Sequence, residues 1–174
     1  MRSRITEAGM SDHDPFNEPE TAHPRARELM TEEFLWDCVD EEAPFGSDEG
    51  HDAYYEFREW RQRNKKKQLT ACLVWIMQGE DLENYDDELC SDEAIDQALE
   101  NPDEAFLADA YDMFTLDATV IATALGQLLD EGRIDLAAKP YVLVAIKRQL
   151  HPKIVTSEHR REILLAVQRV VEAA

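Results

Sequence analysis

Residues 44–52, Pro-Phe-Gly-Ser-Asp-Glu-Gly-His-Asp, bring together a dense set of groups that could do chemistry. Ser47, Asp48, His51 and Asp52 supply a hydroxyl, an imidazole and two carboxylates within six residues. Hydrolases use such groups as nucleophile, base and orienting acid, and metal-assisted enzymes use them as ligands. Two glycines in the segment would allow positive φ and a close approach of the backbone to a ligand. The segment is therefore a candidate ligand-binding loop.

Aromatic residues near this segment could complete such a site, but the segment also has a structural explanation. Phe45 could contact a ligand together with Trp36 and Trp60, or it could fill the core. Asp48 or Asp52 could equally cap the helix that follows. The candidate ligand-binding residues are thus Phe45, Ser47, Asp48, His51, Asp52, Trp36 and Trp60.

No other motif in the sequence indicates a reaction. The chain contains no glycine-rich phosphate loop, no Gly-x-Ser-x-Gly segment and no His-Glu-x-x-His segment. The oxygen ligands near His51 do not follow the order of a calcium loop, and no second histidine lies four residues away. We therefore predict no catalytic residue, no metal site and no cofactor.

The three cysteines also give no indication of disulfide bonds or of a catalytic thiol. They are scattered, odd in number and form no Cys-x-x-Cys pair, which favours a reducing, cytoplasmic location. Cys38 and Cys72 fall among apolar residues, so we expect both to be buried structural residues rather than nucleophiles. Cys90 is expected at the boundary of the core.

The net charge limits the classes of partner. The chain of 174 residues has 38 acidic and 18 basic residues, a formal charge of −20. Such a charge repels nucleic acid and anionic membranes and attracts basic proteins. The longest apolar run, residues 71–77, has seven residues, far fewer than the roughly 20 of a membrane span. We predict a soluble protein that binds neither nucleic acid nor membrane.

The charge is also distributed unevenly along the chain. Residues 68–132 contain 17 acidic residues and no lysine or arginine, whereas residues 133–174 contain eight basic and four acidic residues. Apolar residues recur throughout the acidic segment at helical spacing, which indicates a folded surface rather than a disordered tail. We expect part of this charge to pair with the C-terminal cations and with residues 58–67, and the surplus to face solvent or a partner.

These features favour a non-enzymatic binding protein that presents a negative helical surface, within residues 80–117, to a basic protein partner. Immunity proteins and inhibitors of nucleic-acid enzymes use this electrostatic logic to gain association rate. The predicted surface residues are Asp81, Glu83, Asp86, Asp87, Glu88, Asp92, Glu93 and Asp96. The alternative is a small hydrolase or metal-assisted enzyme built on residues 45–52. A third possibility is a scaffold that self-associates through its basic C-terminal helix, and the sequence does not indicate the oligomeric state.

Helical periodicity predicts an all-α fold, a compact bundle of seven or eight short helices with a long polar loop near residues 40–51. Residues 1–20 read as a mobile acidic lead-in, and residues 21–174 as one helical domain. Residues 69–77 are too short for periodicity to separate helix from strand, although their composition favours helix. Helix starts are expected at Pro24, Thr31, Asp52, Gln68, Ser91, Asn101, Asp117, Pro140 and Thr156 or Ser157, with a stop at Gly132.

Three segments resemble the YfeS-like group of small bacterial proteins. They are His-Pro-Arg-Ala-Arg-Glu-Leu-Met-Thr-Glu-Glu-Phe-Leu-Trp-Asp-Cys-Val-Asp at 23–40, Ala-Pro-Phe-Gly-Ser-Asp-Glu-Gly at 43–50 and Phe-Arg-Glu-Trp-Arg at 57–61. The resemblance implies a bacterial, cytoplasmic protein of unassigned function. It also implies that the loop at 45–50, with Trp36 and Trp60, is a hallmark of the group. Some members carry a tryptophan-glycine-arginine module that this chain lacks, and the resemblance supplies no chemistry.

Overall fold

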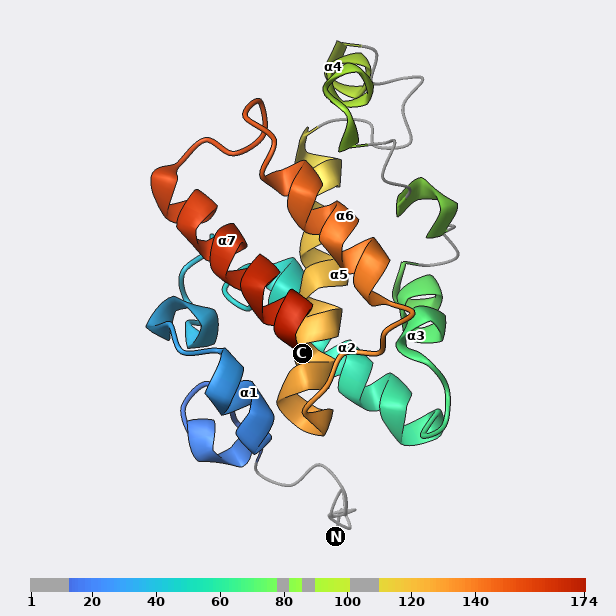
Figure 1. Cartoon of the computed structure of the whole chain (residues 1–174). Helices are drawn as coiled ribbons and strands as arrows, with labels where there is room; N and C mark the ends of the chain where they lie inside the picture. Colours follow the sequence, from blue (N-terminus) through green and yellow to red (C-terminus); the bar gives the residue numbers. More distant parts are fainter. Residues whose placement is uncertain (1–12, 78–81, 86–89, 101–109) are drawn as a thin grey trace, which may run out of the picture.

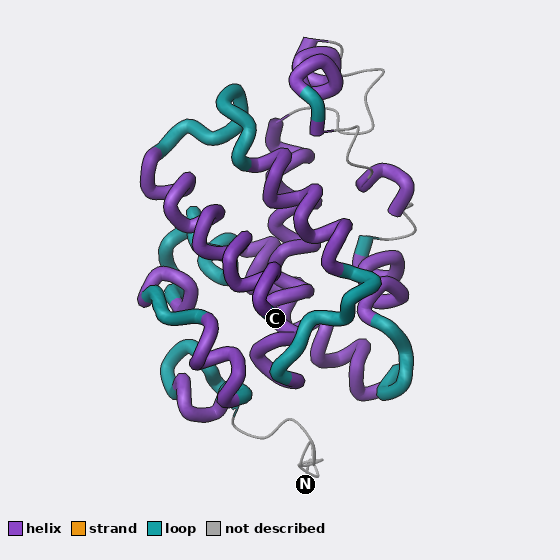
Figure 2. The backbone as a smooth tube through the Cα atoms, in the orientation of Figure 1, coloured by secondary structure: helices purple, strands orange, loops and turns teal. Residues whose placement is uncertain are grey.

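The computed structural model describes residues 13–77, 82–85, 90–100 and 110–174. Every regular element in these residues is helical, which confirms the predicted all-α class (Figure 2). The α-helices are α1 Pro24–Leu29, α2 Asp48–Arg63, α3 Leu69–Ile76, α4 Asp92–Glu100, α5 Ala110–Glu131, α6 Lys139–Gln149 and α7 Glu158–Ala173. Three 3-10 helices accompany them: η1 Pro19–Thr21, η2 Glu33–Trp36 and η3 Leu82–Tyr85. The ambiguous segment at 69–77 is thus a helix.

Helix α5 forms the centre of the bundle (Figure 1). It packs against α2, α3 and α6, and α7 packs against α6. Residues 120–129 of this helix are all buried, as expected for a helix surrounded by others. Thr123 and Gln127 are buried polar residues among them. The buried apolar residues are Val120, Ile121, Ala122, Ala124, Leu125, Leu128 and Leu129.

The length of α5 corrects one sequence prediction. Asp117 was expected to begin a helix, but α5 runs through it without interruption from Ala110 to Glu131. Asp117 is not a cap because its carboxylate, which is 0% exposed, accepts hydrogen bonds from Arg148 and Gln149 of α6. The preference of aspartate for helix ends is therefore outweighed by a tertiary ion pair. The start predicted at Asn101 lies outside the described residues.

The ion pair between Asp117 and Arg148 joins α5 to α6 inside the core. The Arg148 guanidinium donates from Nε at 2.9 Å and from Nη2 at 2.6 Å to the two carboxylate oxygens, and Gln149 Nε2 donates to Oδ2 at 2.8 Å. Burial by itself lowers the pKa of Arg148, but the hydrogen bonds and charge of Asp117 outweigh it and raise this pKa above its ordinary value. The guanidinium also stacks over the Tyr85 ring, with Cζ 4.8 Å from the ring centroid.

Helix α2 begins four residues earlier than predicted. Ser47, and not Asp48 or Asp52, is the N-cap, because its hydroxyl accepts a hydrogen bond from Gly50 N at 3.2 Å. Asp48 and Glu49 then occupy the first turn, where carboxylates stabilise the positive end of the helix dipole. The polar loop before α2 therefore ends at residue 47 rather than 51.

The segment 31–39 contains less helix than predicted. Thr31 does not cap it, and only the four residues of η2 are helical. The Asp37 carboxylate ends η2 by accepting hydrogen bonds from Val39 N and Asp40 N at 2.7 and 3.0 Å, a side-chain turn that competes with helix. These hydrogen bonds also lower the pKa of Asp37. As a result, Cys38 is exposed rather than buried.

The other two cysteines are buried. Cys72 lies in the core on α3, as predicted, and burial raises the pKa of its thiol to about 12, which makes it a poor nucleophile. Cys90 is also more deeply buried than expected, and its Sγ donates to the carbonyl oxygen of Val144 at 3.4 Å.

Helix α5 ends at a glycine, and its last turn is hydrogen-bonded to the chain before α1. Gly132 has a φ of 73°, the left-handed conformation typical of the residue after a helix. His23 N donates to the carbonyl oxygen of Leu129 at 2.8 Å, so the chain before α1 satisfies one of the last carbonyls of α5. The predicted stop at Gly132 is therefore confirmed.

Ion pairs confirm that cations from elsewhere neutralise part of the acidic segment. Arg58 pairs with Asp130 at 3.1 Å, and Arg61 pairs with Glu131 at 2.6 Å. In the C-terminal part of the chain, Lys153 pairs with Asp96 of α4, and His151 Nε2 lies 2.8 Å from Asp92 Oδ1. In the described part of the chain, no helix has the length and apolar composition needed to cross a membrane.

Candidate functional site: an acidic pocket where α2 and α7 begin

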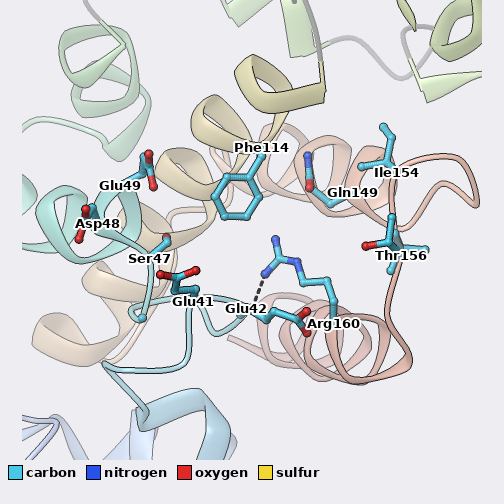
Figure 3. Close-up of a pocket in the computed structure, with 12 residues that line it drawn as sticks. Glu41, Glu42, Ser47, Asp48, Glu49, Phe114, Gln149, Ile154, Thr156 and Arg160 are labelled. Atoms are coloured by element: carbon cyan, nitrogen blue, oxygen red, sulfur yellow. Dashed lines mark hydrogen bonds between the residues drawn. The ribbon is translucent and has the colours of Figure 1, made fainter.

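A pocket of about 430 Å³ lies at the end of the bundle where α2 and α7 begin (Figure 3). Three stretches that are far apart in sequence form most of it: the loop before α2 with the first turn of that helix, the connection between α6 and α7 (residues 150–157), and the start of α7. We call it the acidic pocket. Its lining residues are Glu41, Glu42, Gly46, Ser47, Asp48, Glu49, Phe114, Gln149, Ile154, Val155, Thr156 and Arg160.

Carboxylates dominate the polar lining of the acidic pocket. Glu41, Glu42, Asp48 and Glu49 all belong to it, and Glu41 and Asp48 are exposed at its mouth. The Glu42 carboxylate is fixed in place by the Ser157 hydroxyl, which lies 2.7 and 2.9 Å from its two oxygens. A group of this kind attracts cations and repels free anions.

Arg160 is the cation among the described residues that line the pocket. Its guanidinium projects into the pocket toward Phe114 (Figure 3), with Cζ 5.4 Å from the ring centroid. Nη1 donates to the backbone carbonyl oxygen of Glu42, and no carboxylate of the described residues lies within ion-pair distance of the guanidinium. Burial lowers the pKa of Arg160, against the opposing charges of Glu42, Asp117 and Asp40. This cation is therefore only partly compensated.

Gln149 supplies an open acceptor in the same pocket. The residue is only 3% exposed, and its Nε2 donates inward to Asp117. Its Oε1 accepts no hydrogen bond from any described residue, although the side chain lines the pocket. This oxygen can therefore accept a hydrogen bond from water or from a ligand N–H.

Two helix N-termini add partial positive charge to the pocket. Ser47 caps α2, and Ser157 caps α7 by accepting from Arg160 N at 3.0 Å. The unpaired N–H groups and dipoles of helix starts favour anions, with a range of about one turn. The pocket thus combines carboxylates at its mouth with a guanidinium and two helix starts beside it.

Glycine positions explain how the loop folds over α2. A Cβ at Gly46 would lie 1.7 Å from Asp40 O, and one at Gly50 would lie 1.9 Å from Pro44 O. Neither glycine has a positive φ. Among the described residues, the glycine with a positive φ is Gly132. The expectation that these glycines provide unusual φ values is therefore wrong. They permit the loop to approach its own backbone closely.

The structure brings only part of the predicted ligand-binding set to the pocket. Ser47 and Asp48 line it. Phe45 instead fills the core, where its ring centroid lies 5.1 Å from that of Phe16 and 5.7 Å from that of Tyr54. This is the structural role considered as the alternative, and it also places Phe16, from the predicted lead-in, against the helical body.

The remaining predicted residues lie elsewhere. His51 packs among aromatic rings, with its centroid 5.0 Å from that of Tyr55, and Asp52 is exposed on α2. Trp36 donates from Nε1 to the carbonyl oxygen of Met30 at 2.8 Å, and Trp60 is buried near the other end of α2. These four residues do not line the acidic pocket.

The geometry also bears on the hydrolase alternative. Ser47 uses its hydroxyl as a helix cap, and among the described residues no hydrogen bond joins this hydroxyl to the His51 imidazole, although His51 N donates to the Ser47 carbonyl oxygen at 3.0 Å. His51 Nδ1 is buried without a partner in the described part of the chain. Among the same residues, no three His, Cys, Asp or Glu side chains are placed to hold a metal ion. The segment therefore presents no assembled nucleophile and base.

The predicted acidic surface is only partly described. Asp81, Asp86, Asp87 and Glu88 lie outside the described residues, as does the side chain of Glu83. On α4, Asp92 is 85% exposed while accepting from His151 Nε2 at 2.8 Å, Glu93 is exposed, and Asp96 pairs with Lys153. The predicted surface on α4 and the acidic pocket both adjoin the connection at 150–157.

Several lining residues were not singled out from the sequence. Glu41, Glu42 and Arg160 meet across more than a hundred residues, and no local pattern links them. The sequence offered one usable signal, the Ser157 cap, which places Arg160 in the first turn of a helix.

Protonation of His159 is expected to strengthen the attachment of the loop to α7. Its Nε2 lies 2.6 Å from Asp40 Oδ2, and this hydrogen bond raises the pKa of His159 above 6.5. The contribution is therefore present below pH 6.5 and is lost as the pH rises through the raised pKa. An NMR titration should give His159 a pKa above 6.5 in the wild type and a lower one in Asp40→Asn. An unchanged pKa in that variant would contradict the pairing.

Comparison of the chain with protein-family models, curated proteins and solved structures found no match, so the resemblance to the YfeS-like group stays a prediction and the function must be argued from the site.

Proposed function

We propose that this chain is a non-enzymatic binding protein that recognises a basic protein partner through its acidic end. We define the acidic end as the exposed carboxylates around the connection at 150–157. They are Glu41 and Asp48 at the pocket and Asp92 and Glu93 on α4. The proposal keeps the kind of partner predicted from the charge and adds the acidic pocket to the predicted surface.

The observation that carries the proposal is the excess of carboxylates over cations in one concave site. Four glutamate and aspartate residues line the acidic pocket together with a single arginine among its described lining. Elsewhere in the described chain, three acids of the 68–132 segment, Asp130, Glu131 and Asp117, pair with Arg58, Arg61 and Arg148. The acidic pocket, in contrast, keeps a surplus of carboxylates over its described cation.

This arrangement suits recognition of a basic surface in energetic terms. A standard interface covers about 800 Å² on each partner, enough to include the pocket mouth and the start of α4. Complementary charge mainly raises the rate of association and selects partners, and its effect falls as salt screens it. These properties match an immunity or inhibitor protein that must bind a basic toxin or enzyme quickly.

The test is affinity capture with a charge-neutralised variant. Glu41→Gln, Asp48→Asn and Glu93→Gln combined remove three exposed carboxylates from the acidic end. Wild-type protein immobilised at about 50 mM salt, a Debye length near 14 Å, should retain a basic protein from an extract of the source cells. The triple variant should lose at least tenfold in affinity for that protein once it is identified and purified.

A matched control makes the outcome specific. Glu18→Gln, Glu20→Gln and Glu33→Gln remove three exposed carboxylates from the segments that flank α1 in sequence, and none of them lines the acidic pocket. This control should bind like the wild type, and both variants should melt within a few degrees of it, since each helix-start charge is worth about 0.3–1 kcal/mol. Equal losses in both triple variants, or binding that does not weaken with salt, would contradict the proposal.

A further inference from the structure

We infer that the acidic pocket holds the C-terminal carboxylate of a basic chain, with Arg160 pairing with the carboxylate and the carboxylates at the mouth pairing with lysine or arginine side chains that precede it. The inference rests on the proposed function, because it names the part of the basic partner that enters the pocket.

Arg160 indicates an anionic group in the ligand. A guanidinium has five N–H donors, and among the described residues Arg160 uses one of them, toward the carbonyl oxygen of Glu42. The group projects into the pocket over Phe114 and has no carboxylate within ion-pair distance among the described residues. A planar guanidinium pairs best with a carboxylate, which it can bind with two parallel hydrogen bonds.

Gln149 indicates a donor next to that anion. Its Oε1 has no donor among the described residues, and the residue is 3% exposed where it lines the pocket. The last residue of a peptide offers both groups at once, an amide N–H and a terminal carboxylate. The start of α7, which carries Arg160 in its first turn, also favours the carboxylate end.

The mouth of the pocket restricts which chain ends can enter. Glu41 and Asp48 at this mouth would repel a neutral or acidic chain that brings only a negative terminus. A terminus preceded by lysine or arginine carries its own positive charge to these carboxylates. The pocket volume of about 430 Å³ suits one terminal residue with its side chain rather than a long segment.

Two peptides test the inference on the unmodified protein. Both are acetylated hexapeptides of alternating glycine and lysine, and one ends in a free carboxylate while the other ends in a carboxamide. The carboxamide has the greater positive charge, so general attraction to an acidic surface favours it. Calorimetric titration should instead show at least tenfold tighter binding of the free acid, the factor expected for a hydrogen-bonded charge pair.

Variants assign the preference to the pocket. Arg160→Gln should remove the preference for the free acid, whereas Arg161→Gln, an equal charge change at the next and exposed residue of α7, should retain it. The Arg160 Nε–Hε signal should shift when the free acid is added to the wild-type protein. This measurement does not depend on how the variant folds.

Three outcomes would overturn the inference. Equal or tighter binding of the carboxamide would leave the proposed function standing and remove the chain end from it. Binding of free L-arginine as tight as that of the peptide would assign the pocket to a free amino acid instead. Absence of binding by either peptide, in a protein that still captures a basic partner, would place the contact elsewhere on the acidic end.

Discussion

Replacing Asp117 with alanine is expected to lower the free energy of unfolding by about 3–5 kcal/mol, because it leaves the Arg148 guanidinium buried without its carboxylate. Domains of this kind are stable by about 5–15 kcal/mol, so the loss is a large fraction of the total. For a chain of this length the melting temperature should fall by roughly 6–20 °C. Chemical denaturation followed by circular dichroism measures the free energy of unfolding, and a thermal melt followed by the same signal measures the melting temperature.

The double variant separates an unpaired charge from a lost contact. Asp117→Leu combined with Arg148→Met replaces both charges with apolar side chains, and buried pairs replaced in this way often cost little. We expect it to recover most of the stability that Asp117→Ala loses, although Gln149 Nε2 also loses an acceptor, at a cost of about 1–3 kcal/mol. If Asp117→Ala alone costs less than about 1 kcal/mol, the pair does not hold α5 to α6.

Gly46→Ala is expected to destabilise the protein by about 2–3 kcal/mol, the upper part of the range for overpacked sites. The added Cβ would lie 1.7 Å from Asp40 O, and a backbone oxygen cannot move aside as a flexible side chain can. The loop would have to leave its position over the start of α2, which also displaces Glu41 and Glu42 from the pocket. We therefore expect a loss of peptide binding larger than the loss of stability explains.

Gly126→Ala provides the matched control. Its Cβ would lie 2.8 Å from a Tyr54 ring carbon, a clash with a side chain, and alanine gains about 1 kcal/mol over glycine inside a helix. The net change should be smaller than in Gly46→Ala, and peptide binding should persist because residue 126 does not line the pocket. Equal effects of the two substitutions on binding would contradict the assigned role of Gly46.

Most of the fold could be predicted because its signals are local. Pro24 at the start of α1, Ser157 before α7 and Gly132 after α5 act through their own conformational preferences. Asp117 misled the prediction because its partner, Arg148, lies 31 residues away and overrides its local preference. Asp37 ended a predicted helix through a side-chain turn that periodicity does not reveal.

The site could be predicted only in part for the same reason. Ser47 and Asp48 were found because reactive side chains gather near them in sequence. Arg160 and Gln149 were not, because their importance comes from what they lack, an ion pair and a hydrogen-bond donor, and that is visible only once the neighbours are placed. The structure therefore replaced most of the candidate site residues, whereas the kind of partner that we propose is the one that the sequence predicted.

The separation in sequence of the two sides of the pocket has a kinetic consequence. Ser157 binds Glu42 across 115 residues, and His159 binds Asp40 across 119. Helices α5, α6 and α7 meet through much shorter chain segments, so they can associate before the loop closes over them. We expect the contacts of residues 40–47 to form after the folding transition state and to break early in unfolding. Binding competence would then disappear before the helical core does, and a ligand that ties the loop to α7 would act chiefly by slowing unfolding.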